Sequence, residues 1–321
     1  MAARNDERVV LGARSIGDVP GGSVVTLGTF DGVHLGHRAL VARARSEADA
    51  LGLPLFGHTF SPLPSRVLAP DRAPRPLIST PERARRLLLA GVDRVVVEPF
   101  DLALAALDPE DFVRDLLMRL SPRHVVVGFN FKFGRDRRGS PQALTAAGRA
   151  LGFSTDVVPA FELDGLPVSS SRIRGLLEDG DASGAARLLG APHELFGPVV
   201  EGDRRGRLVG VPTANLAPGE ELVPRAGVYA TVTTLPDGAR LPSVTNVGMR
   251  PTFGGQELRV ETHVLGFEGD LYTKWIRVAL VDRIRDERRF DGLEALVAQI
   301  RDDMARARAI LHRMGLVSST P

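Results

Sequence analysis

Between residues 24 and 159 the chain alternates short apolar runs with amphipathic segments, and this alternation limits the possible folds more than any other feature. The apolar runs have the length and composition of strands and comprise Val24–Leu27, Leu53–Phe60, Val92–Val97, His124–Val127 and Ser154–Val158. The segments between them have helical spacing, as in Gly36–Leu51, whose apolar residues share one face. Strands that alternate with helices in this way predict a doubly wound parallel sheet.

Ligands of doubly wound sheets bind outside the carboxyl ends of the strands. Three turns follow predicted strands at that edge, namely Gly28-Thr29-Phe30-Asp31, Thr59-Phe60 and Gly128-Phe129-Asn130. The first of them leads directly into His34-Leu35-Gly36-His37, where the next helix begins. We therefore expect this turn to be part of a binding site.

The His34 to His37 segment has the features of a phosphate site. A helix N-terminus offers free backbone N–H groups and the positive end of the helix dipole. Gly36 lets a phosphate approach the backbone closely, because it has no Cβ atom. A nucleotidyl transferase needs this kind of site, since it positions two substrates and stabilises the charge that develops on the attacked phosphate.

A second anion site is indicated by Ser169-Ser170-Ser171-Arg172-Ile173-Arg174, which opens a helix expected to run to about Glu178. A structural N-cap needs only one hydroxyl, and arginines are unfavourable at the positive end of a helix. The two arginines are therefore better explained by an anionic ligand than by helix stability.

The pattern changes in the second half of the chain. From Pro198 to Val281, β-type runs at Gly227–Thr233, Arg259–Gly266 and Ile276–Val281 are broken by Gly and Pro, which predicts an antiparallel barrel. A final helix is expected over Leu293–Met314. Its apolar stripe should pack against the barrel and consists of Leu293, Leu296, Val297, Ile300, Met304 and Leu311.

Composition excludes several classes of protein. No apolar run approaches the roughly 20 residues that span a bilayer, which argues against a membrane protein. The N-terminus has no apolar core of a signal peptide, which argues against a secreted protein. The net charge of +2 does not indicate a nucleic-acid partner. The absence of cysteine excludes disulfides and thiolate metal sites and makes a cytoplasmic location the simplest expectation. Neither Lys132 nor Lys274 follows a GxxxxG loop, so ATP chemistry here does not use a Walker A lysine.

Taken together, these motifs resemble the prokaryotic bifunctional riboflavin kinase/FMN adenylyltransferase family, also called FAD synthetases. In the first half the resemblance rests on GTFDGVHLGH, TFSPLPSRVL, VVVGFNFKFG and SSSRIR. In the second half it rests on EGDRRGRLVGVPTANL, GVYA, NVGMRPTFGG, VETHVLGFEGDLY and IRDERRFDGLEAL. It implies an adenylyltransferase domain over residues 1–185, which makes FAD from FMN and releases pyrophosphate, and a riboflavin kinase domain over residues 191–321, which makes FMN. ATP would be the co-substrate of both reactions, with Mg²⁺ as the cofactor.

For the first domain, the resemblance implies an ATP site formed by Gly28, Phe30, Asp31, His34, His37, Ser171, Arg172 and Arg174. The two histidines would be catalytic, and Asn130 would help to position FMN. Phe131 and Phe133 are candidates either for flavin packing or for the core. Asp31 has an alternative role as a turn former before Gly32.

For the second domain, backbone N–H groups around Gly202, Gly206 and Gly210 would hold the phosphates of ATP. Thr213 and Asn215 would provide the hard oxygen ligands that suit Mg²⁺, and Glu261 would be the general base on the ribityl hydroxyl. Taken singly, Thr213 and Asn215 could equally mark a turn, and Glu261 could be a solvent-facing strand residue.

Two alternatives remain open from the sequence. The first is a nucleotidyl transferase for another small phosphorylated substrate, with the barrel as an accessory domain. The second is a non-catalytic flavin-binding regulator, suggested by Leu63, which stands where the family often has a histidine that contacts ATP. In the leading interpretation the partners are small molecules only, riboflavin, FMN and ATP, with no nucleic acid and no membrane.

Overall fold

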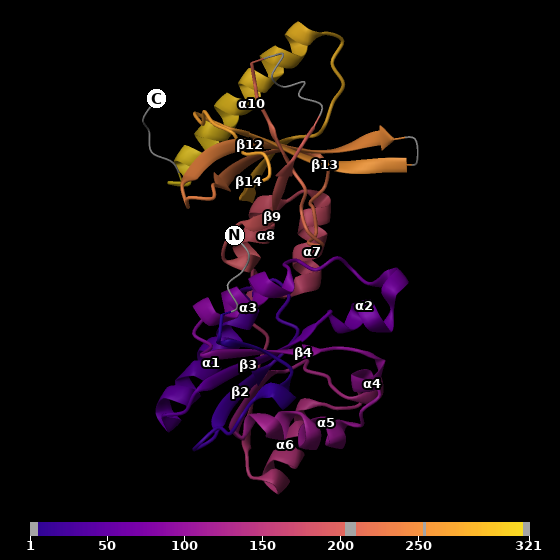
Figure 1. The fold of residues 1–321 in the computed structure, drawn as a ribbon, viewed down its shortest axis with the longest axis vertical. Helices are drawn as coiled ribbons and strands as arrows, with labels where there is room; N and C mark the ends of the chain where they lie inside the picture. Colours follow the sequence, from indigo (N-terminus) through magenta and orange to yellow (C-terminus); the bar gives the residue numbers. More distant parts are fainter. Residues whose placement is uncertain (1–5, 203–209, 253–254, 317–321) are drawn as a thin grey trace. The chain divides into compact units, whose positions relative to one another are not determined.

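The computed structural model describes residues 6–202, 210–252 and 255–316. The chain divides into two compact units, Met1–Ser170 and Ser171–Pro321, and each is described by itself (Figure 1). Within the described ranges, no helix has the length and apolar character needed to cross a membrane.

The first unit is built on a six-stranded sheet in which all neighbouring strands are parallel, in the order β1-β4-β3-β2-β5-β6. The strands are β1 (Val9–Leu11), β2 (Ser23–Leu27), β3 (Leu55–Ser61), β4 (Arg94–Pro99), β5 (Pro122–Gly128) and β6 (Ser154–Val158). The predicted doubly wound sheet is therefore confirmed. Strand β1 was not predicted, because three residues at a sheet edge are too few to show a periodicity.

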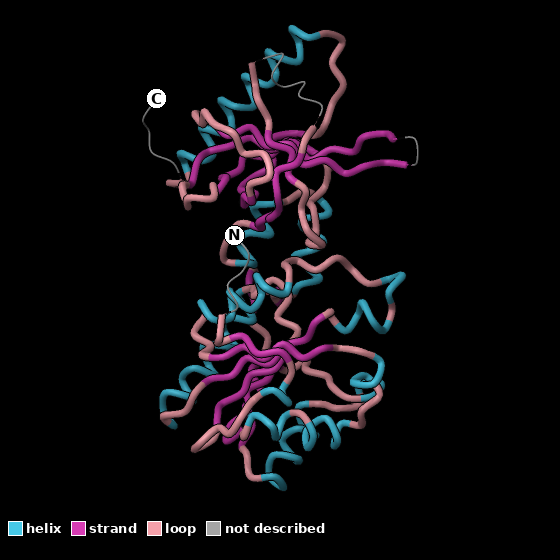
Figure 2. The backbone as a smooth tube through the Cα atoms, in the orientation of Figure 1, coloured by secondary structure: helices cyan, strands magenta, loops and turns pink. Residues whose placement is uncertain are grey.

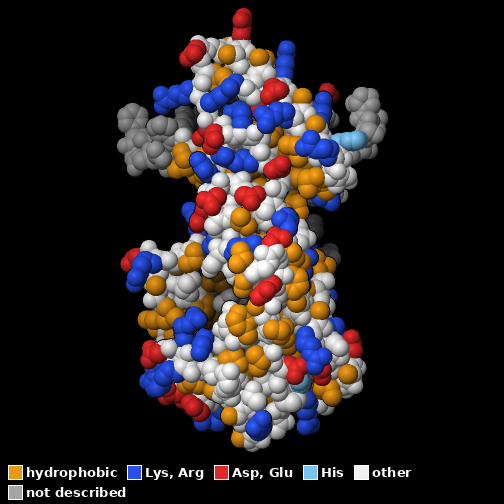
Figure 3. Space-filling model, turned by 180° about the vertical axis from the view of Figure 1, so that it is seen from behind, with side chains coloured by type: hydrophobic (Ala, Val, Ile, Leu, Met, Phe, Trp, Pro, Cys, Tyr) orange, Lys and Arg blue, Asp and Glu red, His pale blue; other side chains and the backbone are white. Residues whose placement is uncertain are grey.

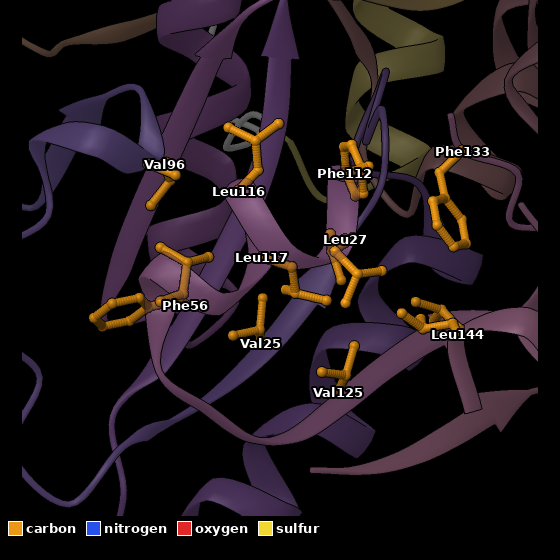
Figure 4. Close-up of a cluster of buried hydrophobic side chains, with 14 of the residues drawn as sticks. Val25, Leu27, Phe56, Val96, Phe112, Leu116, Leu117, Val125, Phe133 and Leu144 are labelled. Atoms are coloured by element: carbon orange, nitrogen blue, oxygen red, sulfur yellow. The ribbon is translucent and has the colours of Figure 1, made fainter. Parts of the chain in front are cut away.

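Helices cover both faces of this sheet (Figures 1 and 2). One face packs against α1 (Leu35–Leu51) and α3 (Thr80–Leu89), and the other against α5 (Pro109–Asp115), the 3-10 helix Leu117–Leu120 and α6 (Pro141–Leu151). Figure 4 shows the second of these cores, in which side chains such as Val25, Phe112 and Leu144 meet. Two short helices, α2 (Pro64–Leu68) and α4 (Leu102–Ala105), lie in the connections, and β7 (Glu162–Leu163) and β8 (Leu166–Pro167) form a small hairpin.

The helices of the first unit begin and end where side-chain chemistry predicts. At the start of α6, the Ser140 hydroxyl accepts a hydrogen bond from the Ala143 amide at 3.2 Å, and Pro141 occupies the first turn. Helix α1 ends at Gly52, which has a left-handed conformation with φ of 65°. These local signals explain why the predicted bounds of the first long helix, Gly36–Leu51, agree with those of α1 to within one residue.

The second unit begins with α7 (Ser170–Asp179) and α8 (Ala182–Leu189) and continues into a closed antiparallel barrel with the order β10-β13-β12-β11-β14-β9. Its strands are β9 (His193–Val200), β10 (Ala214–Leu216), β11 (Gly227–Thr234), β12 (Arg240–Thr252), β13 (Gly255–Val264) and β14 (Trp275–Arg285). The β12–β13 ribbon projects from the barrel (Figure 2). The predicted barrel is confirmed, although the sequence indicated only three of the strands.

The final helix, α10 (Leu293–Arg313), packs against the barrel as predicted, with Leu311 of the predicted stripe buried, but not every residue of the stripe takes part. Leu293 is 62 % exposed, and the side chains that become buried are those of Asp303, Ala307 and Leu311. Asp303 forms a bidentate ion pair with Arg285 of β14, with N···O distances of 2.9 and 2.7 Å. The apolar stripe did not reveal this docking, because a buried ion pair is invisible to hydrophobic periodicity.

Charged side chains of both signs are interspersed over the surface seen in Figure 3. Lys and Arg are not gathered there into a single basic face, in keeping with the small net charge of +2.

Candidate active sites

The turn after β2, at the centre of the parallel sheet, places the two histidines at the start of α1. The Gly28 amide donates to the His58 carbonyl at 3.1 Å, which ties the turn to β3. Phe30 and Val33 have left-handed conformations, with φ of 50° and 45°. Phe30 is fully buried, and its ring meets that of His37 edge-on, with 5.3 Å between the ring centroids. Its predicted contact with ATP stays a prediction.

His34 is the N-cap residue of α1, and its Nδ1 accepts a hydrogen bond from the His37 backbone amide at 3.3 Å. In the neutral ring the proton therefore lies on Nε2. The rings of His34 and His37 stack with their centroids 3.6 Å apart. A Cβ atom at Gly36 would lie 3.2 Å from the His34 ring, so glycine gives this ring its space over the helix start.

Both imidazoles are neutral at neutral pH. Burial lowers the pKa of His34 to about 4. Burial, reinforced by the charges of His34 and Arg83, holds the pKa of His37 well below its usual range. Nδ1 of His37 is buried and has no hydrogen-bond partner in the part of the chain that the structure describes. A buried polar atom of this kind, beside a helix N-terminus, is what an anionic ligand would satisfy.

Asp31 is 2 % exposed and takes part in holding the loop together. Its carboxylate accepts a hydrogen bond from the Leu77 amide at 2.8 Å, and its backbone carbonyl accepts one from the Ser170 hydroxyl at 2.8 Å. These contacts connect Asp31 to residues distant in the chain, and its two predicted roles, as an ATP contact and as a turn former before Gly32, stay predictions.

The predicted helix of the SSSRIR motif is present as α7. Ser171 is exposed, and Arg172 and Arg174 are half-buried in its first two turns. These three residues belong to the second unit, whereas the histidines belong to the first. That they hold the phosphates of the same ATP molecule as the histidines stays a prediction.

The aromatic residues after β5 divide into core and surface. Phe133 is 6 % exposed and belongs to the core, where it stacks on Phe131 with 5.4 Å between centroids. For Phe133 the core alternative therefore holds. Asn130 is exposed, and Phe129, which was given no role, is 51 % exposed at the carboxyl end of β5. It belongs to the Gly128-Phe129-Asn130 turn, which was predicted to lie at the ligand-binding edge of the sheet.

Leu63, the residue that departs from the family pattern, is 8 % exposed and precedes α2 at its N-cap position. A buried leucine there supplies packing and no hydrogen bond to a nucleotide.

In the barrel, strand register brings the predicted kinase residues together. Asn215 of β10 pairs with Glu261 of β13, which in turn pairs with Asn246 of β12. The three side chains therefore share one face of the barrel wall. Glu261 is 33 % exposed, with its Oε1 3.7 Å from Nη1 of Arg259. Asn246 was not predicted, although it stands in the NVGMRPTFGG motif.

The glycine-rich loop before β10 is only partly described. A Cβ atom at Gly202 would lie 2.2 Å from the Asn215 amide nitrogen, so a larger residue here would displace the side chain of the predicted metal ligand. Gly210 is exposed with φ of 73°. Gly206 lies outside the described residues, so its predicted role is untested.

A cavity of about 70 Å³ lies beside Thr213 and is lined by residues that include Pro212, Thr262, Phe267, Asp270 and Tyr272. Mixed apolar and polar lining of this kind suits a small organic ligand. Over the described ranges, no cluster of three or more His, Asp or Glu side chains is close enough to hold a metal ion by itself. A metal at this site would need oxygen ligands from elsewhere, such as substrate phosphates and water.

Comparison with known proteins matches both halves of the chain. The FAD synthetase family model covers residues 17–172, and the riboflavin kinase family model covers residues 189–311. The chain is 41 % identical over 294 residues to the bifunctional riboflavin kinase/FMN adenylyltransferase of Pseudomonas fluorescens, covering 90 % of this chain and 93 % of that protein. It is 39 % identical to that of Escherichia coli K12, with coverages of 94 % and 97 %, and 35 % identical to that of Bacillus subtilis, with coverages of 89 % and 91 %.

A solved structure is also similar over nearly the whole chain. It is titled as a macrolide-efflux protein from Streptococcus pneumoniae and matches with a TM-score of 0.86 and 32 % sequence identity. The match covers 94 % of this chain and 98 % of that one. The order of the two folds along the chain is thus shared with an experimentally determined structure.

Proposed function

This chain belongs to the family of bifunctional riboflavin kinase/FMN adenylyltransferases, and from that premise we propose which of its residues carry the two reactions. It is an enzyme of flavin cofactor biosynthesis that phosphorylates riboflavin to FMN and adenylylates FMN to FAD, with ATP as co-substrate. Neither a nucleotidyl transferase for another substrate nor a non-catalytic flavin-binding regulator is supported, because both family models match and the relatives span nearly the whole chain.

The two activities are assigned to separate segments. Adenylyl transfer belongs to residues 1–185 and riboflavin phosphorylation to residues 191–321. The matched ranges of the two family models, 17–172 and 189–311, support this division. A location in the cytoplasm, with only small-molecule substrates as partners, is supported by the absence of cysteine and by the small net charge.

For adenylyl transfer, the observation that carries the assignment is the stacked pair of neutral imidazoles at the N-terminus of α1. A phosphate oxygen of FMN attacks the α-phosphorus of ATP, and the bond to the pyrophosphate oxygen breaks. The Nε2–H of His34 and the free amides of α1 donate hydrogen bonds to the charge that grows on the phosphates. The buried Nδ1 of His37 forms a hydrogen bond with the same phosphate group. Ser171, Arg172 and Arg174 hold the remaining phosphates. Asn130 positions FMN.

For the kinase reaction, the assignment depends on the pairing of Asn215 in β10 with Glu261 in β13, which places the two side chains next to each other. Glu261 accepts the proton of the terminal ribityl hydroxyl while that oxygen attacks the γ-phosphorus of ATP, and ADP leaves. Gly202 and the rest of the loop to Gly210 bring backbone amides toward the phosphates.

We assign Mg²⁺ to Thr213 and Asn215. A hydroxyl and an amide oxygen are hard ligands, and a site without a cluster of carboxylates suits an ion that retains water and binds substrate phosphates. When bound, Mg²⁺ would neutralise part of the negative charge on the phosphates of ATP. The residues of the chain then orient the nucleotide through Asn215, whose amide is packed against Gly202.

One experiment tests these assignments together. The wild-type protein and its His37→Ala and Glu261→Gln variants are incubated with riboflavin, ATP and Mg²⁺, and the flavins are separated by chromatography. The wild type should accumulate FAD, His37→Ala should stop at FMN, and Glu261→Gln should leave riboflavin unconverted. Equal FAD production by all three proteins would refute the residue roles.

A further inference from the structure

A buried arginine stands behind the histidine site. Arg83 of α3 is 2 % exposed and is among the largest fully buried side chains of the described chain. Arginine is rarely buried unless its guanidinium group is well bonded. The mechanism proposed above does not use this residue.

The guanidinium of Arg83 connects two neighbouring strand ends to its own helix. Nη1 donates to the Thr29 carbonyl at 2.8 Å, and Nη2 donates to the Phe60 carbonyl at 2.8 Å and to the Thr80 hydroxyl at 2.9 Å. Thr29 lies in the turn after β2, and Phe60 lies in the last part of β3. One planar side chain with fixed donor directions therefore fixes these two carbonyls relative to each other.

The Thr29 carbonyl belongs to the turn that supports the catalytic histidine. It also accepts a hydrogen bond from the Thr59 hydroxyl at 3.1 Å. The next residue, Phe30, has φ of 50°, which is unfavourable for an aromatic residue and persists only where its surroundings enforce it. The Phe30 ring lies edge-on to the His37 ring. The contacts thus run from Arg83 through Thr29 and Phe30 to His37.

We propose that Arg83 is a positioning residue for adenylyl transfer, which holds the Thr29–Phe30 turn against the end of β3 and so fixes the ring of His37 at the phosphate site. This inference rests on the role proposed for His37. Arg83 acts through the turn and need not touch the substrate.

The charge of Arg83 has a second consequence. Burial is the main cause of the lowered pKa of His37. Two neighbouring groups, His34 on the same turn and Arg83 on α3, lower this pKa further because each disfavours a second positive charge nearby. Arg83 therefore favours the neutral imidazole that donates and accepts hydrogen bonds at the phosphate. Removal of its charge should make His37 easier to protonate.

Two substitutions separate the position of Arg83 from its charge. Arg83→Lys keeps the charge but loses the planar fork, whereas Arg83→Gln keeps a short amide donor but loses the charge. Arg85→Gln is the matched control, because Arg85 lies on the same helix with its side chain 50 % exposed and bonds to Glu82. The full-length proteins are used, and thermal unfolding of each variant verifies that it is folded.

The first readout is the titration of the His37 ring by nitrogen-15 NMR, which needs no activity. We expect it to move to higher pH in Arg83→Gln and to keep the wild-type position in Arg83→Lys and Arg85→Gln. The second readout is the conversion of FMN to FAD. Both Arg83 variants should lose about 10–100-fold in kcat with KM values for ATP and FMN little changed, while Arg85→Gln should match the wild type.

The proposal is overturned if Arg83→Lys keeps the wild-type kcat, or if Arg83→Gln leaves the His37 titration unchanged. Should Arg83→Gln fail to fold, Arg83→Lys alone decides through its kcat. If His37→Ala itself retains full FAD synthesis, the role of His37 fails, and the NMR titration still reports separately whether Arg83 acts on that ring.

Discussion

The histidines of the first unit are hydrogen-bonding groups, and their neutrality has a physical cause. A buried imidazolium is costly, so burial keeps both rings uncharged at neutral pH. The N-cap contact of His34 occupies Nδ1 and leaves the Nε2–H as the group that would donate to a phosphate in the proposed site. A neutral donor of this kind, held in place before substrate binds, needs little reorganisation when charge develops.

His37→Ala should reduce FAD formation by about 10²–10³ in rate, because it removes one preorganised group from the attacked phosphate. FMN formation should be unaffected, since every residue assigned to that step lies in the barrel. The measurement is the rate of each step with riboflavin or FMN as the starting flavin. If adenylyl transfer were unchanged, both histidines would have to be regarded as structural.

Glu261→Gln should abolish FMN synthesis through kcat, with a loss of about 10²–10⁴, because glutamine keeps the shape of the side chain but cannot accept a proton. Riboflavin and ATP binding should remain close to wild type. FAD production from supplied FMN serves as the internal control for a folded preparation. Wild-type FMN synthesis by this variant would mean that the proton leaves by another route.

Thr213→Ala should weaken the binding of Mg²⁺ together with ATP, because the variant lacks one hard oxygen ligand. The signature is a KM for ATP that falls again as the Mg²⁺ concentration is raised. The same Mg²⁺ titration with Glu261→Gln is the matched comparison, and it should give no rescue. Identical behaviour of the two variants would argue against Thr213 as a metal ligand.

At the scale of elements, the docking of α10 illustrates how a polar pair can replace an apolar stripe. Asp303, whose side chain is 4 % exposed, accepts three hydrogen bonds from Arg285 of β14 and one from Gln299 at 2.8 Å. Ala307 and Leu311 complete the contact with the outer face of the barrel. The long apolar residues at the start of α10 contribute less to this packing, since Leu293 is exposed.

Asp303→Ala should destabilise the barrel by about 3 kcal/mol, because it leaves a partly buried arginine without its carboxylate. Fluorescence of Trp275, the single tryptophan of the chain, reports unfolding of this unit from its place on β14. Asp302→Ala is the matched control, since Asp302 is 58 % exposed and lies 3.9 Å from Arg306. It should change the free energy of unfolding by no more than about 0.5 kcal/mol.

At the scale of the whole molecule, the two activities should separate with the chain. A fragment of residues 1–185 should convert FMN to FAD and leave riboflavin untouched, whereas a fragment of residues 191–321 should make FMN only. The boundary between the compact units, after Ser170, allows a sharper comparison. Residues 1–170 lack Ser171, Arg172 and Arg174, so this shorter fragment should lose adenylyl transfer if those residues hold ATP.

The readout for each fragment is product formation by chromatography, with flavin binding as the control for folding. A C-terminal fragment that folds and binds flavin yet never makes FMN would contradict the division of labour. Full adenylyl transfer by residues 1–170 would agree with the assignment of this activity to the first part of the chain. It would also show that the SSSRIR motif is not part of the ATP site.

The class of each half, the bounds of the first long helix and the motifs that identify the family follow from local sequence patterns alone. These are local properties, because periodicity, caps and glycine turns are written within a few consecutive residues. Only the tertiary structure decided which side chains meet. It placed Phe133 in the core and Phe129 at the surface, set Asn246 opposite Glu261, and docked α10 through Asp303. It also buried Arg83 beneath the histidine turn. Strand register and burial depend on residues distant in the chain, so no local pattern can report them.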